Sequence, residues 1–254
     1  MKRKLISCLM VTSAKMERFE SIKKSIGSFC RQTYPNKELV IILDSPSKTD
    51  YQRLIRYLSP LGKQQQIRIF DPGKKHCLGS LRNISIIQAR GEILCQWDDD
   101  DLSHPTRVER QLEFLLKKKA GAVLLSNVLH YYVQTQVCYW TNWSSFSCQA
   151  LPCTIMMHKN QCIGYRKLTR REDLCFLSRL ASWTQVEVLN APPFLYTYIF
   201  HGKNTWNLKH HLSLTMQCAE PIDKIRRYQN FLLKGMKEAG LDICSVRFGD
   251  MTEF

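Results

Sequence analysis

Four consecutive aspartates, Asp98–Asp101, directly follow the apolar run Ile93–Trp97. A short apolar run is typical of a buried strand, and burying unpaired charge costs a large free energy. The carboxylates must therefore leave the core where the strand ends. In an open α/β sheet ligands bind at this edge, and carboxylate oxygens are ligands that suit Mg²⁺ and Mn²⁺. The alternative is a solvated acidic turn in which Asp101 caps the next helix.

Polar side chains also follow the first two predicted strands. Thr12 and Ser13 come after the first strand, and Asp44 comes after the second. A carboxylate at Asp44 suits the ring N–H of uracil, because a charge-assisted hydrogen bond is about twice as strong as a neutral one. The two hydroxyls could contact the same nucleotide, or they could only cap the next helix.

Charged groups suited to anions or to proton transfer occur in three further segments. Arg82 begins a predicted helix, where its planar guanidinium and the helix N-terminus both favour an anion. Asp173 lies in the first turn of a helix that begins at Glu172, where acids commonly serve only the helix dipole. His201 follows an aromatic strand and Lys203 comes two residues later. On local grounds alone, such a histidine is usually a polar surface residue.

Apolar strand-like runs alternate with segments of helical periodicity through the first half of the chain. We predict strands at residues 5–11, 38–43, 67–70 and 93–97, with helices at 19–30, 51–58 and 79–89. Nearly continuous apolar strands are typical of parallel strands that are covered on both faces. This alternation predicts an α/β fold with a Rossmann-like, mostly parallel sheet flanked by helices.

The second half of the chain is less regular. We predict a helix after Pro105, a strand at 123–133, an irregular segment at 139–153 and an amphipathic helix at 222–240. His210 and His211 lack a motif around them, and we expect both at the surface. Because the chain has no internal repeat and no Gly/Ser linker, we expect one domain with two lobes.

Composition narrows the possible partners. The 254 residues include 37 Lys+Arg and 22 Asp+Glu, a net charge of +15, which suits phosphorylated ligands or an anionic membrane surface. Basic residues are dispersed and no nucleic-acid-binding motif occurs, so we expect no nucleic-acid partner. The eleven cysteines form no C-x-x-C pair, which favours a reducing, cytoplasmic setting. No apolar run approaches the roughly 20 residues of a membrane span, so peripheral contact at the inner membrane face stays open.

Six short motifs occur in one order over about residues 5–210. They are Met10-Val11-Thr12, Ser25–Asp44, Leu81-Arg82-Asn83, Gly91-Glu92 before the aspartates, Glu172-Asp173 and His201-Gly202-Lys203-Asn204-Thr205. Together they resemble family 2 glycosyltransferases, which have the GT-A fold. A lone D-x-D is common by chance, so the specificity lies in the combination. The resemblance implies a catalytic domain at 1–220, with a nucleotide-sugar lobe over about 1–101 and an acceptor lobe over 102–220, and a C-terminal helical extension at 221–254.

The resemblance also implies a role for each candidate residue. Asp98, Asp100 and His201 would bind Mn²⁺ or Mg²⁺, which neutralises a diphosphate leaving group. Asp173 would be the general base that removes the proton of the acceptor hydroxyl. The residues expected to contact the nucleotide-sugar are Thr12, Ser13, Asp44, Arg82, Asp98, Asp99 and Lys203.

We therefore expect an inverting glycosyltransferase that moves a sugar from a nucleotide-diphosphate donor, with UDP-sugar as the expected donor, to a glycan or lipid-linked acceptor. A sugar nucleotidyltransferase is one alternative, but it needs a Gly-rich phosphate loop after the first strand, and Val11–Lys15 contains no glycine. A non-catalytic nucleotide- or glycan-binding module of the same fold is another. The presence of all the expected acids argues against that module.

Overall fold

A seven-stranded sheet forms the centre of the larger lobe. The computed structural model describes residues 3–250, except for the side chains of residues 62–65. In sheet order the strands are β10 (Val186–Leu189), β6 (Ala122–Leu125), β9 (Leu151–His158), β4 (Ile93–Gln96), β1 (Ile6–Thr12), β2 (Lys37–Leu43) and β3 (Ile67–Phe70). The strands β1 to β4 are parallel, whereas β9 is antiparallel to both β4 and β6. The predicted α/β fold with a mostly parallel sheet is confirmed.

Helices cover both faces of this sheet, because alternate strand residues point to opposite sides and both sets are apolar. One layer consists of α1 (Phe19–Cys30), α2 (Lys48–Gln65) and α4 (Arg107–Lys118), and the other of α3 (Leu78–Gln88) and α5 (Glu172–Ala181). The first layer packs on the sheet through buried residues that include Ile26, Leu54 and Val108. The second layer packs through residues that include Leu81 and Phe176. The predicted helical periodicities therefore mark core contacts, except that Tyr51 and Ile55 of α2 are exposed.

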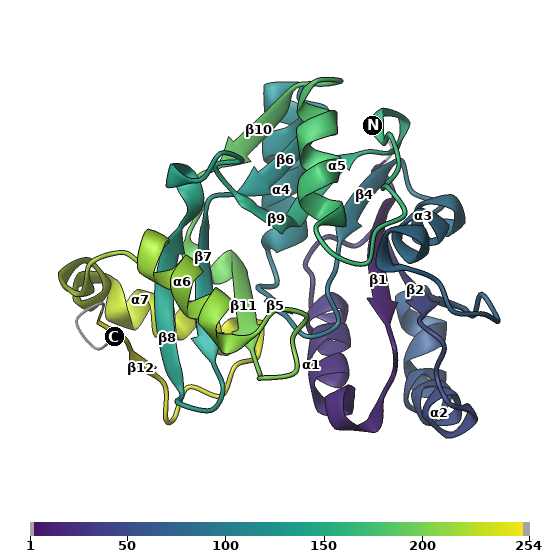
Figure 1. Cartoon of the computed structure of the whole chain (residues 1–254), viewed down its shortest axis with the longest axis horizontal. Helices are drawn as coiled ribbons and strands as arrows, with labels where there is room; N and C mark the ends of the chain where they lie inside the picture. Colours follow the sequence, from purple (N-terminus) through teal and green to yellow (C-terminus); the bar gives the residue numbers. More distant parts are fainter. Residues whose placement is uncertain (1–2, 251–254) are drawn as a thin grey trace.

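A five-stranded sheet forms the second lobe, on the left in Figure 1. Its strands in order are β12 (Arg247–Phe248), β8 (Val137–Asn142), β7 (Asn127–Tyr132), β11 (Tyr196–Phe200) and β5 (Leu102–Ser103). On one face lies α7 (Ile222–Ala239), which buries Ile225, Leu232 and Met236 completely. The other face carries α6 (Leu208–Cys218), whose His211 packs against Phe200. Both faces of the smaller sheet are thus covered by C-terminal helices.

The strand predicted at 123–133 is wrong as a single element. It forms two strands, β6 and β7, that belong to different sheets and separate at Ser126. There the Ser126 carbonyl accepts the N–H of Trp143 at 2.8 Å, and the Ser126 N–H donates to the Leu189 carbonyl at 3.3 Å. Because both strands are buried, the apolar run continues from one into the other, and the sequence does not indicate that β6 ends there.

Two further features of the second half differ from prediction. The segment 139–153, expected to be irregular, contains most of β8 and the start of β9. The helix α6 was not predicted, because it buries His211 and Thr215 where an ordinary amphipathic helix buries apolar residues. His211 has no exposed surface, so its predicted surface position is wrong. His210 is half-buried and its ring stacks on Trp206 with centroids 4.6 Å apart.

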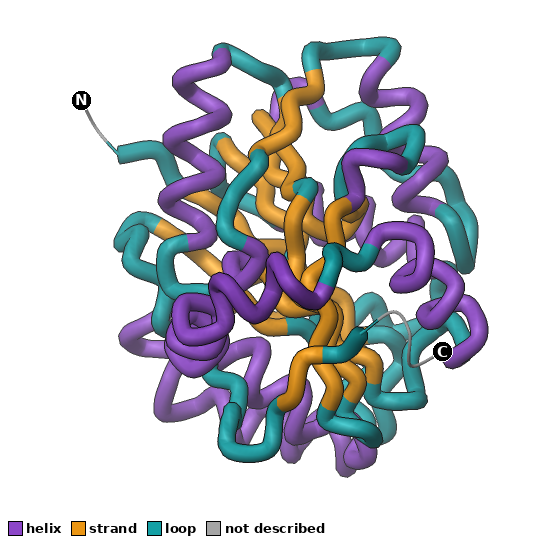
Figure 2. Tube along the Cα trace, turned by 90° about the vertical axis from the view of Figure 1, so that its left-hand side faces the viewer, coloured by secondary structure: helices purple, strands orange, loops and turns teal. Residues whose placement is uncertain are grey.

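The carboxyl ends of β1, β2 and β4 meet at one edge of the larger sheet. Thr12 lies opposite Leu43, and the N–H of Asp44 donates to the Thr12 carbonyl at 2.8 Å. Beyond β4, the N–H of Trp97 donates to the Leu9 carbonyl at 3.0 Å, after which the aspartates begin. Figure 2 shows the strands running through the middle of the molecule with helices outside them. No helix in the described part of the chain is long and apolar enough to cross a membrane.

Candidate active site

A cavity of about 670 Å³ opens at this edge of the sheet. The predicted residues that line it are Thr12, Ser13, Asp44, Arg82, Asp98, Asp99, Asp100 and Asp173. His201 lies beside it, with Nε2 3.0 Å from the Asp100 carboxylate. Lys203 is more remote, since its exposed ammonium group lies 3.6 Å from Glu17. The structure thus brings eight of the ten predicted residues to one cavity and the other two to its margin.

Asp101 differs from the other three aspartates because its side chain is hydrogen-bonded to β11 in the second lobe. One carboxylate oxygen accepts the hydroxyl of Tyr196, and the other accepts the N–H of Ile199 at 2.8 Å. Burial, together with the charges of Asp100 and Asp98, raises the pKa of Asp101 well above its usual range. Asp101 therefore ties the loop after β4 to β11.

The other three carboxylates face the cavity and are held by cations or by an amide. Asp98 accepts from Gln96 at 2.7 Å, Asp99 from Arg18 at 2.6 Å and Asp100 from Arg18 at 2.8 Å. Burial raises the pKa of Asp99 to about 7 although Arg18 opposes the shift. For Asp100, burial is outweighed by the hydrogen bond from His201 and the charge of Arg18, which lower its pKa. Burial also raises the pKa of Asp98, against the charge of Arg82, so Asp100 is the one of these three carboxylates whose pKa is lowered.

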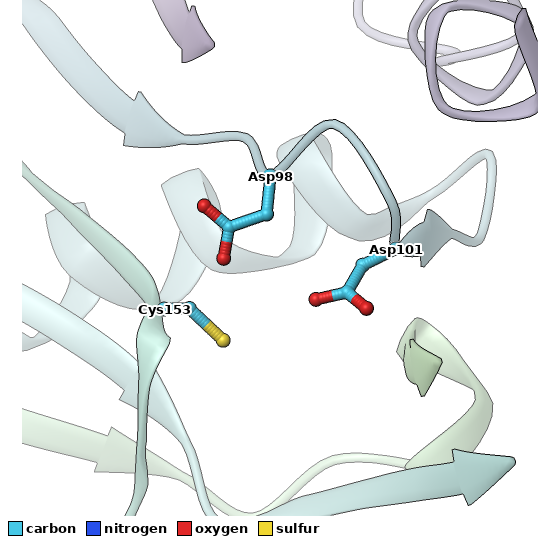
Figure 3. A group of neighbouring side chains, drawn as sticks. All are labelled: Asp98, Asp101 and Cys153. Carbon is cyan, nitrogen blue, oxygen red and sulfur yellow. The ribbon is translucent and has the colours of Figure 1, made fainter. Parts of the chain in front are cut away.

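The donor atoms of this edge fit a hard divalent cation. Asp98, Asp101 and Cys153 place potential ligand atoms within 4.8 Å of one another, and Figure 3 shows these side chains converging from the loop after β4 and from β9. Cys153 is a poor ligand for Mg²⁺ or Mn²⁺, which prefer oxygen, and burial raises its pKa well above the usual thiol range. Both oxygens of Asp101 are already hydrogen-bonded. Asp98 and Asp100 therefore offer the more suitable oxygens.

His201 is oriented by its own loop. The backbone N–H of Lys203 donates to His201 Nδ1 at 3.2 Å, so Nδ1 is the acceptor and Nε2 carries the hydrogen that points to Asp100. Asn204 fixes the loop by accepting the N–H of His201 at 2.9 Å and donating to the Ile199 carbonyl at 2.8 Å. Coordination through Nε2 would require that hydrogen to leave.

Arg82 connects the aspartates with the start of α5. Its Nε donates to the buried Glu172 at 3.0 Å, and its Nη2 lies 3.8 Å from Asp98. Burial alone would lower the pKa of Arg82, but the charges of the surrounding carboxylates outweigh burial, so the pKa is raised above the usual arginine value. The guanidinium also lies over the Tyr165 ring at 5.5 Å. Arg82 is thereby fixed between two acids.

Asp173 stands next to Glu172 but has different surroundings. Its Oδ1 accepts the N–H of Leu174 at 2.7 Å, and among the described residues no cation forms an ion pair with it. Burial raises the pKa of Glu172, and Arg82 opposes that shift. Glu172 therefore positions Arg82, while the half-buried carboxylate of Asp173 faces the cavity.

A basic and aromatic rim completes the cavity beside Asp173. The guanidinium carbons of Arg170 and Arg171 lie 5.3 and 5.9 Å from the centre of the Trp206 ring. Cation–π contacts of this kind hold an aromatic side chain in place without covering it on all sides. Trp206 lines the cavity together with both arginines.

Sequence reasoning missed several lining residues. They include Arg18, Lys75, His76, Cys77, Cys153 and Tyr198. Arg18 belongs to a short 3₁₀ helix, Met16–Arg18, in the loop after β1. The rule that singled out Thr12 and Ser13, namely that loops after parallel strands bind ligands, extends to Arg18 as well. Cys153 and Tyr198 carry no such signal, because β9 and β11 reach the cavity only through tertiary packing.

A family model described as glycosyl transferase family 2 matches residues 10–175. This span is more than half of the chain, and the chain therefore belongs to that family.

Several relatives carry the same class of name. An uncharacterized glycosyltransferase of Haemophilus influenzae is 26% identical over 246 residues, which is 87% of this chain and 72% of the relative. An uncharacterized glycosyltransferase of Methanocaldococcus jannaschii is 28% identical over 126 residues, 50% of this chain and 42% of the relative. The O-antigen biosynthesis glycosyltransferase WbnJ of Escherichia coli is 24% identical over 117 residues, 46% of this chain and 45% of the relative. The chain spans less than half the length of these last two relatives.

Solved structures share the fold. TarS of S. aureus in complex with UDP-GlcNAc has a TM-score of 0.63 at 14% identity, covering 94% of this chain and 68% of that one. Mannosyltransferase PcManGT from Pyrobaculum calidifontis, in complex with GDP-Man and Mn²⁺, has a TM-score of 0.60 at 12% identity, covering 94% and 73%. The GT-A fold expected from the sequence motifs is confirmed.

Proposed function

We propose that this chain transfers a sugar from a UDP-sugar to a hydroxyl group of a glycan or lipid-linked acceptor, with inversion at the anomeric carbon. One observation carries the proposal: a single cavity gathers acids from three separate segments, namely Asp44 after β2, Asp98–Asp100 after β4, and Glu172 and Asp173 at the start of α5. Arg82 from α3 lines the same cavity and pairs with Glu172 and Asp98. A binding module would need only some of these groups.

Asp173 is the proposed general base. It removes the proton of the acceptor hydroxyl while that oxygen attacks the anomeric carbon from the face opposite the diphosphate. A base must be unpaired and accessible to the acceptor, and Asp173 is half-buried, lines the cavity and forms no ion pair in the described part of the chain. Glu172 supports this role indirectly, because it is the acid that accepts the hydrogen bond of Arg82 Nε.

Asp98 and Asp100 are the proposed holders of Mn²⁺ or Mg²⁺, with His201 beside them. The cation would supply charge neutralisation for the diphosphate leaving group. Thr12, Ser13 and Asp44 line the part of the cavity proposed for the nucleoside, and Arg82 and Asp99 line the rest of the proposed donor site. Lys203, outside the cavity wall, is proposed to complete that site with its positive charge.

The choice of donor and acceptor rests on chemistry and on relatives. Proteins of similar fold are named in complex with UDP-GlcNAc or with GDP-Man and Mn²⁺, which supports a nucleotide-sugar donor. A relative named for O-antigen biosynthesis supports a saccharide acceptor. The net charge of +15 supports a cytoplasmic setting in which the protein meets the anionic inner face of a membrane peripherally.

A thermal-shift experiment tests the donor site. We expect UDP to raise the melting temperature when Mn²⁺ is present and to have no effect with a chelator, because the aspartates otherwise repel the diphosphate. Asp100→Asn should abolish this dependence on the cation. Asp71→Asn is the matched control. Asp71 also follows a strand of this sheet, β3, but in the described part of the chain it does not line the cavity.

The outcomes separate the parts of the proposal. Equal stabilisation by UDP with and without chelator would show that the cation has no role in donor binding. No stabilisation by any nucleoside diphosphate would overturn the proposed function.

A further inference from the structure

One carboxylate oxygen of the aspartate cluster is shared by two donors. Asp100 Oδ2 accepts from Arg18 Nη2 at 2.8 Å and from His201 Nε2 at 3.0 Å. The same Arg18 nitrogen lies 2.6 Å from Asp99 Oδ1. A guanidinium nitrogen therefore bridges two of the aspartates proposed to serve the cation and the donor.

Arg18 is positively charged throughout the pH range in which proteins are folded. Burial would lower its pKa, but Asp99 and Asp100 outweigh that effect and raise it. Its Nε is buried without a hydrogen-bond partner in the described part of the chain. The guanidinium is thus bound at one nitrogen and unsatisfied at another, and an unsatisfied buried donor costs free energy that a further acceptor would recover.

A divalent cation and this guanidinium cannot use Asp100 Oδ2 independently. Both are attracted by the same carboxylates, and like charges within a few ångströms repel each other strongly where water is partly excluded. Only 23% of the Arg18 side chain and 14% of the Asp100 side chain are exposed, so solvent screens this repulsion weakly.

We propose that Arg18 is a built-in counter-ion of the aspartates, which competes with the divalent cation for Asp100 and moves onto the donor diphosphate when the cation binds. This inference rests on the proposed function for its second step, but its first step concerns the protein and the cation alone. Arg18 lines the same cavity as Asp100, so the guanidinium can reach a diphosphate there by turning its side chain.

The competition also links two loops. The Arg18–Asp100–His201 contacts join the loop after β1 to the loop after β11, and the pair Glu17–Lys203 joins the same loops at 3.6 Å. A cation on Asp100 displaces the first of these links and leaves the exposed, weaker pair. Cation binding is therefore coupled to the freedom of the loops on either side of the donor.

The test compares Arg18→Met with the parent protein and with Arg226→Met. Methionine keeps much of the length of arginine without its charge, and Arg226 is a matched control because this exposed residue pairs with Asp223 within α7 at 3.6 Å and is not among the residues that line the cavity. Binding of Mn²⁺ without nucleotide is followed by the electron paramagnetic resonance signal of the free ion. We expect Arg18→Met to bind Mn²⁺ more tightly than the parent, on the order of tenfold, a typical coupling between two sites. UDP binding at saturating Mn²⁺, followed by calorimetry, should weaken in the same variant.

Unchanged or weaker Mn²⁺ binding in Arg18→Met, with the control at the parental value, overturns the inference. Tighter Mn²⁺ binding with undiminished UDP binding also overturns it, because the guanidinium then has no second position on the diphosphate. Arg18→Gln repeats both measurements if the methionine variant melts before the parent. Sugar transfer by the parent is assayed separately, so a failed proposed function shows itself as an inactive parent whatever the effect of Arg18.

Discussion

Asp44 is the side chain proposed to distinguish one nucleotide from another. Its carboxylate is half-buried at the end of β2, and its N–H is held by the Thr12 carbonyl. The sheet therefore fixes the backbone of Asp44 at the edge of the cavity that this residue lines.

We expect UDP to bind more tightly than CDP, because the ring N–H of uracil donates to a carboxylate whereas the corresponding nitrogen of cytosine has a lone pair. Asp44→Ala should remove most of the difference, roughly 10- to 150-fold for a charge-assisted hydrogen bond of about 1.5–3 kcal/mol. Calorimetry with both nucleotides measures the ratio, and Asp71→Ala provides the control. Equal affinities in the parent protein would remove Asp44 from base recognition.

Asp173→Asn separates catalysis from binding. The amide keeps the size of the side chain but lacks a basic oxygen, so transfer should fall by roughly 10²- to 10⁴-fold, the usual contribution of a positioned acid or base. Donor affinity should change little, because the base acts on the acceptor. A radiolabelled donor with pooled glycan and lipid-linked acceptors gives the rate, and NMR of the product gives the anomeric configuration.

Asp223→Asn is the control for this measurement, since Asp223 lies exposed on α7. Near-parental transfer by Asp173→Asn, or a product that retains the donor's configuration, would contradict a single displacement with Asp173 as base.

The acids of the candidate site could be predicted because an unpaired carboxylate cannot follow a buried strand into the core and must lie at the edge of the sheet. The loop after β1 could have pointed to Arg18 as a site residue, but its pairing with Asp99 joins residues 81 positions apart and leaves no local pattern. Glu172 and Asp173 are adjacent and chemically alike, and only the structure shows that Glu172 binds Arg82 whereas Asp173 forms no ion pair in the described part of the chain. Their catalytic and binding roles stay predictions.

At the level of elements, β7 and α6 share a buried pair of histidines. His130 Nε2 lies 3.1 Å from His211 Nδ1, and the hydroxyl oxygen of Thr215 lies 3.0 Å from His130 Nδ1. Burial lowers the pKa of His130 well below its usual range and that of His211 to about 4. Both rings are therefore neutral in the folded protein near pH 7 and bind protons more readily in the unfolded chain.

This pair should make stability depend on pH. Its contribution is fully present above about pH 6.5, the usual pKa of histidine, and is lost as the pH falls from there toward 4, because the unfolded state then binds more protons. The expected slope is at most about 1.4 kcal/mol per pH unit for each histidine. Denaturant unfolding of the parent and of His211→Gln at several pH values measures it, with His76→Gln as control. The same slope in all three proteins would contradict the prediction.

Elements of the first half were predictable because their apolar periodicity coincides with their burial. In α6 the two signals separate, since His211 and Thr215 occupy the buried face. The break between β6 and β7 depends on backbone hydrogen bonds of Ser126 with Leu189 of β10 and with Trp143 after β8. The apolar run itself does not reveal these bonds.

For the whole molecule, the division at residue 220 stays a prediction that truncation can test. Residues 221–254 include α7, whose fully buried Ile225, Leu232 and Met236 each stabilise the fold by about 1.5–3 kcal/mol. A Cβ at Gly235 would lie 2.2 Å from the Phe194 ring, so helix and lobe are in close contact there. We expect a chain ending at residue 220 to melt at a lower temperature and to bind more of a hydrophobic dye. A parental melting temperature would show that the segment is a separable extension.

The overall fold class could be predicted from the order of elements, but the position of β9 could not. Along the chain β9 comes after β4, β6, β7 and β8, yet in the sheet it pairs with β4 and β6. Such long-range antiparallel pairing follows from the packing of the complete chain.

The position of β9 has a consequence for synthesis on the ribosome. Until residues 151–158 have left the exit tunnel, β4 presents an open hydrogen-bonding edge, and β6 lacks its link to the sheet that contains β1. An exposed strand edge is a template for pairing with other chains, and long-range pairings form slowly. Translation must therefore pass well beyond the aspartates before the nascent chain can close the surface on which they lie.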